Sequence, residues 1–202
     1  MKVIGVGSGP NMTRINDWDT DGMTVVGVNN VWRGTDKWDH LIFAGDYPLK
    51  HDIKKVRPEQ ELHSRDLNKD FVTSYCAMSG MNFAEARIWC GMPIYFNLTY
   101  WSMHYLKPEV IGFIGFDMNY TPKEDGSTAF YGKGIDMQLR GIPDPLYQVQ
   151  TMYKNDPNTM DILFDRLEGK RKEHGVKFFN LSDDPESILP WEKITFDEFK
   201  EV

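Results

Sequence analysis

Short apolar runs, each followed by glycine or a polar residue, recur along the chain. Five such runs cover residues 2–6, 24–28, 41–44, 110–114 and 176–180. Continuous apolar runs rich in β-branched and aromatic residues are typical of parallel strands that are buried on both faces. The stretches between them can hold helical crossovers, so the pattern predicts an α/β fold with a mostly parallel sheet flanked by helices.

Helices are predicted where apolar residues return every three or four positions. The first stripe consists of Ile94, Leu98, Trp101 and Tyr105, and the second of Met160, Leu163, Phe164 and Leu167. The second helix is expected to start near residue 158 and to end at Gly175. Further short helices are expected after residue 10 and in the acidic tail, and the charged stretch 48–72 is interpreted as a surface helix and loop.

Residues 118–156 carry glycine, proline and aromatic residues without a clear period. This stretch is predicted to form a loop region that resembles a lid. No linker or internal repeat divides the 202 residues, a length that suits one domain, so residues 1–202 are interpreted as a single domain.

Charge and cysteine content exclude several classes of protein. The chain has 23 Lys and Arg against 30 Asp and Glu, a formal net charge of −7, which argues against nonspecific nucleic-acid binding. Two cysteines form neither a disulfide framework nor a four-cysteine zinc site, and no metal site is expected. We see no signal peptide and no apolar run of the roughly 18 residues that a membrane span needs, so the expectation is a cytoplasmic protein without a membrane partner.

Candidate chemistry gathers at the ends of the predicted strands. Four strands are followed by Gly7-Ser8-Gly9, Asn29-Asn30, Gly45-Asp46 and Gly115-Phe116-Asp117. Ligands of an open parallel sheet bind outside the carboxyl ends of its strands. Glycines allow close approach, asparagine amides can pair with a base or ribose, and the two carboxylates can take a proton or hold a metal. Turns favour the same residue types, but the four strand ends together predict a nucleotide or nucleotide-sugar site.

The first loop matches neither of two common phosphate-binding motifs. Residues 5–9 (GVGSG) lack the third-glycine spacing of the dinucleotide fingerprint, and no Gly-Lys-Ser/Thr follows them. The amides of residues 9–12 are nevertheless expected to lie at a helix N-terminus, where they could hold a phosphate.

Several short motifs occur in the order found in a known superfamily. They are residues 3–12 (VIGVGSGPNM), 28–30 (VNN), 39–46 (DHLIFAGD), 87–91 (RIWCG), 115–121 (GFDMNYT), 126–130 (GSTAF) and 158–162 (NTMDI). On these motifs the chain resembles the small bacterial sialyltransferases that use CMP-sialic acid. It also resembles the related group of archaeal 6-hydroxymethylpterin pyrophosphokinase and motility-associated glycosyltransferases. The resemblance spans about residues 3–180.

The resemblance implies a Rossmann-like sheet with a nucleotide at its strand ends. The residues it assigns to the nucleotide are Gly7, Ser8, Gly9, Pro10, Asn29, Asn30, Asp46, Gly115 and Thr128. The catalytic candidates are Asp46, Asp117 and Tyr120, and Arg87 and Gly91 are assigned to substrate. The sialyltransferase branch is metal-independent, and relatives of this fold often self-associate, so a homo-oligomer is compatible with the resemblance.

Three departures from the sialyltransferase pattern bear on the chemistry. Ser8 stands where those enzymes carry Asn, and Trp89-Cys90 stands where they carry Thr-Ser. No histidine lies in residues 152–157, where they have a catalytic base. The sialyl-transfer machinery therefore does not carry over. Because a histidine base contributes about 10²–10⁴-fold, its absence implies another base, another reaction or none.

The sequence thus predicts a glycosyltransferase-like transferase with a nucleotide-sugar donor and with Asp46 or Asp117 as the base. One alternative is a pyrophosphokinase-like phosphoryl transferase, which would need Mg²⁺. Another is a nucleotide-binding sensor or sequestering protein without turnover. A structural partner protein is the remaining rival, and it would use Trp32, Trp38 and Trp191 at an interface rather than in the core.

Overall fold

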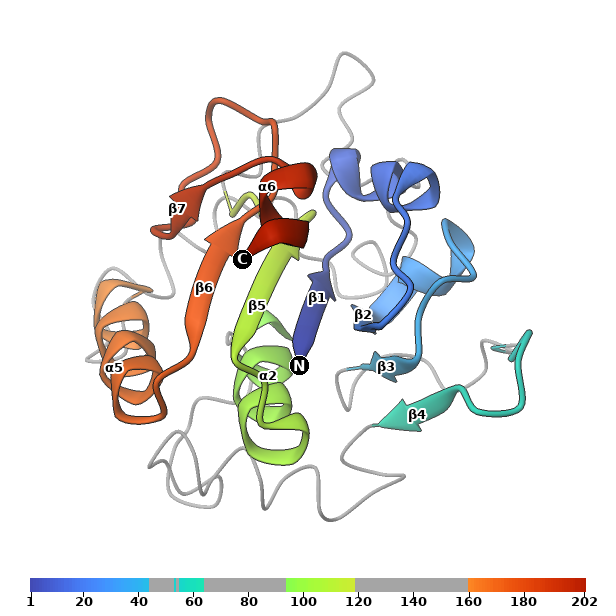
Figure 1. Ribbon diagram of the computed structural model, residues 1–202, viewed down its shortest axis with the longest axis horizontal. Helices are drawn as coiled ribbons and strands as arrows, with labels where there is room; N and C mark the ends of the chain where they lie inside the picture. Colours follow the sequence, from blue (N-terminus) through green and yellow to red (C-terminus); the bar gives the residue numbers. More distant parts are fainter. Residues whose placement is uncertain (44–52, 54, 64–93, 119–159) are drawn as a thin grey trace, which may run out of the picture.

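The structure, a computed structural model, describes residues 1–43, 53, 55–63, 94–118 and 160–202 (Figure 1). Within these residues the strands form one seven-stranded sheet in the order β4-β3-β2-β1-β5-β6-β7, with every neighbouring pair parallel. The strands are β1 (Lys2–Val6), β2 (Met23–Val28), β3 (His40–Ile42), β4 (Glu61–His63), β5 (Val110–Ile114), β6 (Lys177–Asn180) and β7 (Glu192–Lys193). The predicted α/β fold of the Rossmann-like class is confirmed.

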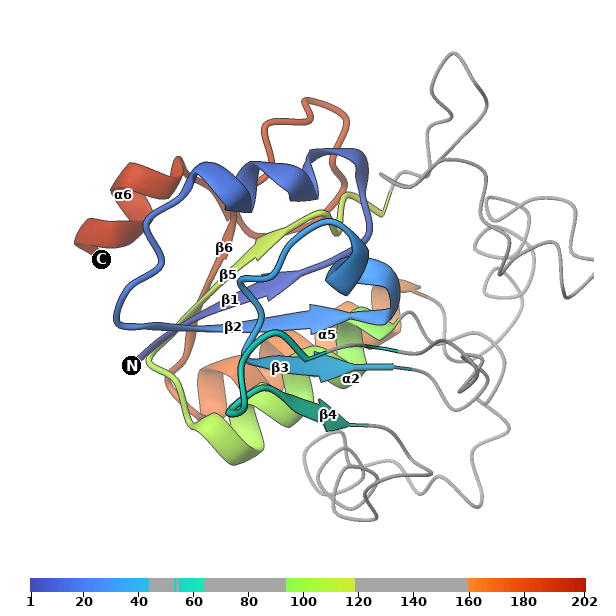
Figure 2. The ribbon, with the colours of Figure 1, turned by 90° about the vertical axis from the view of Figure 1, so that its right-hand side faces the viewer.

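Helices cover both faces of the sheet. They are η1 (Pro10–Asp17), η2 (Asn29–Arg33), α2 (Ile94–Trp101), its π-helical continuation η4 (Ser102–Leu106), α5 (Met160–Glu173) and α6 (Phe196–Glu201). Figure 2 shows η1 and α6 on one face of the sheet and α2 and α5 on the other, so the molecule has three layers. Among the described helices, none has the length and apolar character that crossing a membrane requires.

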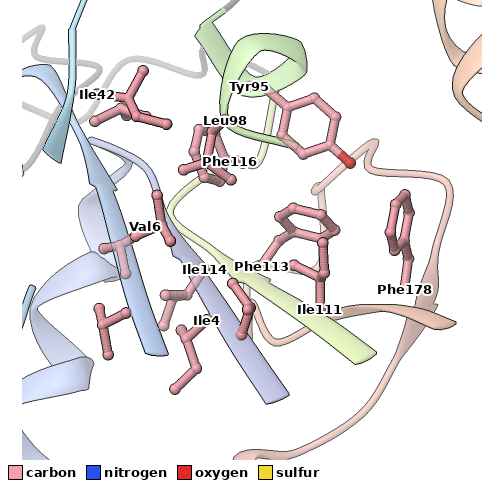
Figure 3. Close-up of a cluster of buried hydrophobic side chains, with 14 of the residues drawn as sticks. Ile4, Val6, Ile42, Tyr95, Leu98, Ile111, Phe113, Ile114, Phe116 and Phe178 are labelled. Carbon is pink, nitrogen blue, oxygen red and sulfur yellow. The ribbon is translucent and has the colours of Figure 1, made fainter. Parts of the chain in front are cut away.

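The core lies on both faces of the central strands, against α2 on one face and against η1 and α6 on the other; Figure 3 shows a part of it. Ile4 and Val6 of β1 and Ile111 and Phe113 of β5 are fully buried. Gly5 leaves room for its neighbours, because a Cβ there would lie 2.9 Å from the Phe113 ring. This burial supplies the main favourable term for folding and fixes where β1 and β5 end.

The first strand and the last helix are joined directly. The Lys2 ammonium donates to the carbonyl oxygen of Phe199 at 3.2 Å and to that of Lys200. Trp18 stacks on Phe196 with ring centroids 4.3 Å apart, so α6 is also held by the residue that follows η1. These contacts seat α6 on the sheet.

Several expected elements have different bounds or a different form in the structure. The helix expected after residue 10 is a 3₁₀-helix, and the helix of residues 93–106 ends as a π-turn. The charged stretch 48–72 contains a strand, β4, that the sequence pattern did not predict. Apart from residue 118, the expected lid at residues 118–156 lies outside the described residues.

The three tryptophans offered as interface residues pack with the core. Trp38 is 1% exposed, and Trp32 and Trp191 are partly buried against the hydrophobic cluster. The Trp191 indole N–H donates to the hydroxyl of the buried Tyr95. The core placement of these side chains is therefore the one observed.

Candidate functional site

The chain reverses its direction across the sheet at β1. It moves outward from β1 to β4 on one side and returns to add β5 on the other side of β1. Ligands of open α/β sheets bind in the crevice outside the carboxyl ends of the strands at such a switch point. We define the switch-point site as the loops that follow β1, β5 and β6, together with the start of η1.

Two glycine-containing loops meet at this point. The Gly7 amide donates to the Ile114 carbonyl and the Gly9 amide to the Gly115 carbonyl, both at 2.8 Å. A Cβ on Gly7 would lie 2.2 Å from the Gly115 oxygen, so no side chain fits there. Gly115 itself has a φ of +72°, a conformation that only glycine adopts without strain. These glycines are required by the contact between the two loops.

The backbone amides expected to hold a phosphate are partly used within the protein. Gly9 N donates to Gly115 O, and Met12 N donates to Gly9 O at 3.1 Å. Pro10 has no amide proton to offer. The expectation of a phosphate cradle is therefore wrong for these three positions.

A buried polar network, centred on Asp117 and Ser182, fills the site. Ser182 Oγ donates to Asp117 Oδ1 and accepts from Asn11 Nδ2 and from the Asp184 amide at 3.1 Å. Asp117 and Ser182 are 5% and 3% exposed. One donor and two acceptor positions are all that a hydroxyl has, so Ser182 is fully paired. Asn11 Oδ1 is buried and has no hydrogen-bond partner in the described part of the chain.

The loop after β6 is built around the same network. The Ser182 amide donates to Asn180 Oδ1 at 2.9 Å, and Asn180 Nδ2 donates to Ser187 Oγ at 3.1 Å. The Ile188 amide donates to the Asp117 carbonyl at 3.0 Å. Asp117 is thus held by its backbone and its side chain, which preorganises the carboxylate.

Burial raises the pKa of the Asp117 carboxyl group above its usual value. Loss of hydration is the largest cause, and the charge of Asp184 adds to it. Hydrogen bonds from Ser182, Asn11 and Ser187 act in the opposite direction because they stabilise the charged form. A buried carboxylate with a raised pKa at a switch point is a candidate acid or base.

The end of β2 contributes two asparagines to the same edge of the sheet. Asn29 has a φ of +47°, a left-handed conformation that asparagine tolerates better than most residues, and Asn30 is buried. β2 is the parallel neighbour of β1, so Asn29, which follows β2, lies at the same edge of the sheet as Gly7, which follows β1. Met118, just after Asp117, also has a positive φ of +59°. Such strained positions often gather at functional sites.

The structure brings together eight of the expected site residues at the carboxyl edge of the sheet: Gly7, Ser8, Gly9, Pro10, Asn29, Asn30, Gly115 and Asp117. Asp46, Arg87, Gly91, Tyr120 and Thr128 lie outside the described residues. Sequence reasoning missed Asn11, Asn180, Ser182 and Ser187. The signal for part of this group was available, because Asn180 is the last residue of β6 and Ser182 follows it closely, at the strand end where the other candidates also lie.

Comparison with known protein families and with curated proteins finds no match. Among solved structures, the chain is similar to the sialyltransferase CST-II in complex with a trisaccharide acceptor and CMP. That pair has 15% identity and a TM-score of 0.49, with 96% of this chain and 86% of the other covered. The chain is also similar to the monofunctional alpha-2,3-sialyltransferase Cst-I from Campylobacter jejuni. Here the identity is 13% and the TM-score 0.41, with 95% and 80% of the two chains covered. At these values the likeness adds nothing to a functional argument, which rests on the site itself.

Proposed function

We propose that the switch-point site binds a nucleotide-sugar and that the protein is a glycosyltransferase-like transferase. The observation that carries the proposal is the buried Asp117 carboxylate, which accepts a hydrogen bond from Ser182 beside the two glycine-containing loops. The order of motifs that resembles sialyltransferases and related glycosyltransferases supports the donor class. Asn29 directly follows β2, and a side-chain amide can both donate to and accept from a base or ribose.

In the proposed reaction Asp117 is the proton acceptor. Its Oδ1 already accepts from Ser182, and its Oδ2 lies so close to Gly9 that a Cβ there would be 2.9 Å away. The acceptor hydroxyl gives its proton to the carboxylate while its oxygen forms a bond to the anomeric carbon. The bond from that carbon to the donor phosphate breaks, and the nucleotide leaves with the electron pair. A raised pKa brings the carboxylate closer to the working pH of a general base.

A nucleotide-binding protein without turnover is the second candidate. It is favoured by the burial of Asp117, which is 5% exposed and already hydrogen-bonded. Phosphoryl transfer with Mg²⁺ has less support, because Asp117 is almost completely buried and its Oδ1 already accepts from Ser182.

The test is a thermal-shift screen with nucleotides and nucleotide-sugars, each with and without Mg²⁺, followed by a search for transfer products. A ligand at about a hundred times its dissociation constant adds roughly 2.7 kcal/mol to the free energy of unfolding. Asp117→Asn should keep binding and lose product formation. Asp183→Asn is the matched control, because Asp183 lies in the loop after β6 next to Ser182, is exposed and pairs with Arg14.

Each outcome separates the candidates. Binding with product formation that D117N removes and D183N retains supports the transferase. Binding of a nucleotide by the wild-type protein without any product favours the sensor or sequestering protein. No shift with any nucleotide or nucleotide-sugar would overturn both proposals.

A further inference from the structure

Three metal-ligating side chains meet on β3 and β4, at one lateral edge of the sheet. His40 is the first residue of β3, and Glu61 and His63 are the first and last residues of β4. In the β3–β4 register His40 pairs with Glu61 and Ile42 with His63. Because side chains alternate along a strand, all three project from the same face of the sheet. That face is the one covered by α2, since Trp101 of α2 packs on both imidazoles.

The three ligand atoms form a compact triangle. His40 Nδ1 and His63 Nε2 are 3.1 Å apart, and each is 3.5 Å from Glu61 Oε2. Tetrahedral Zn²⁺ with bonds of about 2.0–2.1 Å places its ligands about 3.3–3.4 Å from one another. An octahedral ion with bonds of similar length would place adjacent ligands only about 2.8–3.0 Å apart. The mean edge of the observed triangle therefore matches a tetrahedral ion better.

The surroundings suit imidazole ligands. The Trp101 ring centroid lies 5.1 Å from that of His40 and 4.6 Å from that of His63, which limits the rotation of both rings. His63 is 5% exposed, and burial, with smaller effects of His40 and Lys55, lowers its pKa to about 4. Burial also lowers the pKa of His40, against the opposing charges of Glu61 and Asp39. Neutral imidazole is the form that binds a metal.

We propose that His40, Glu61 and His63 together bind one divalent transition-metal ion, Zn²⁺ in tetrahedral coordination. The site is separate from the switch-point site, because it lies under α2 at β3 and β4 whereas the Asp117 network includes Asn11 of η1 (Figure 2). Two imidazoles and a carboxylate are a donor set that zinc uses. The ligands come from two strands, so the ion would tie β4 to its neighbour β3. No such site was expected from the sequence.

The experiment uses the full chain after treatment with a chelator. Co²⁺ is the first probe, because tetrahedral Co²⁺ absorbs visible light. Zn²⁺ does not absorb visible light, so its displacement of Co²⁺ is seen as a loss of absorption. The expected result is saturable Co²⁺ absorption at one ion per chain, its loss on addition of Zn²⁺, and a higher melting temperature with Zn²⁺. Isothermal titration then gives the Zn²⁺ dissociation constant.

Glu61→Gln is the decisive variant. The Glu61 side chain is 60% exposed, so the substitution leaves the packing of the core intact, and Glu59→Gln is the matched control with 63% exposure on the same segment. E61Q should weaken Zn²⁺ binding by at least about 10–100-fold, the loss seen even for residues that only support a ligand. E59Q should bind as the wild type does.

His63→Gln tests the buried ligand, with the exposed His174→Gln as its control. H63Q should abolish the tetrahedral Co²⁺ spectrum, and H174Q should retain it. Absence of the spectrum in the wild type would overturn the proposal. Equal Zn²⁺ affinity of E61Q and E59Q would overturn it as well, whether or not H63Q folds.

Discussion

The Ser182 hydroxyl donates a hydrogen bond to the Asp117 carboxylate, across 65 residues of sequence. Both side chains are almost completely buried. The same hydroxyl accepts from Asn11 and from the Asp184 amide, so it connects η1, the end of β5 and the loop after β6. The candidate site is therefore a network with one central hydroxyl.

Ser182→Ala should lower the free energy of unfolding by about 1–3 kcal/mol, because it leaves buried donors and an acceptor without a partner. Ser187→Ala is the comparison, since the Ser187 hydroxyl accepts from Asn180 at 3.1 Å and donates to Asp117, one partner fewer than Ser182 has. Urea denaturation measures both. If the two variants lose the same stability, Ser182 is not the centre of the network.

Asp117→Asn should change the pH dependence of stability in a defined direction. The pKa of the folded-state carboxyl is raised, so its favourable contribution is complete below the unfolded pKa of about 3.9 and is lost as pH rises through the folded pKa. Asparagine carries no charge at any pH. The melting temperature of D117N relative to the wild type should therefore increase from about pH 3 to about pH 7. A constant or decreasing difference would contradict the raised pKa.

Gly7→Ala should destabilise the protein by at least about 1–3 kcal/mol, the usual cost of overpacking. The new Cβ would lie 2.2 Å from the Gly115 oxygen, and backbone atoms cannot give way as a flexible side chain can. Gly169→Ala is the opposite case: Gly169 lies within α5, and a Cβ there meets nothing within 4 Å. G169A should gain about 0.4–1 kcal/mol. Thermal unfolding of both variants is the measurement, and similar effects would refute the assigned loop contact.

Thr195→Ala should cost about 0.5–2 kcal/mol of unfolding free energy. Thr195 caps α6: its hydroxyl accepts from the Glu198 amide at 3.2 Å, and Glu198 Oε2 accepts from the Thr195 amide at 2.7 Å. Thr195→Ser retains both bonds and should stay near wild type in a denaturant titration. Equal losses for Ala and Ser would show that the cap is not the source of the effect.

The central strands could be predicted from sequence and the edge strands could not. β1 and β5 are buried on both faces, so their apolar runs mark them with the bounds observed. β4 and β7 have the sequences ELH and EK, which carry no apolar pattern. They are strands because they pair with the backbones of β3 and β6, and this pairing cannot be predicted before the order of the strands in the sheet is known.

The candidate site could likewise be predicted only in part. The rule for strand ends located Gly7, Gly115 and Asp117 at one edge. It did not reveal that the glycines serve the contact between two loops, because that contact depends on the β1–β5 register. The pairing of Asp117 with Ser182 and of His40 with His63 likewise depends on which strands are neighbours.

The hydrogen bonds from Lys2 to the last turn of α6 have a practical consequence for rearranging the order of elements along the chain. Because the first strand and the last helix are in contact, a short flexible linker could connect Val202 to Met1. New ends can then be opened at Gly22, an exposed position where a side chain would meet nothing within 4 Å. Such a circular permutant keeps every strand neighbour while β1 is synthesised last instead of first, and surface turns of this kind are where permutation succeeds. The sheet order would then be reached by a different sequence of folding events.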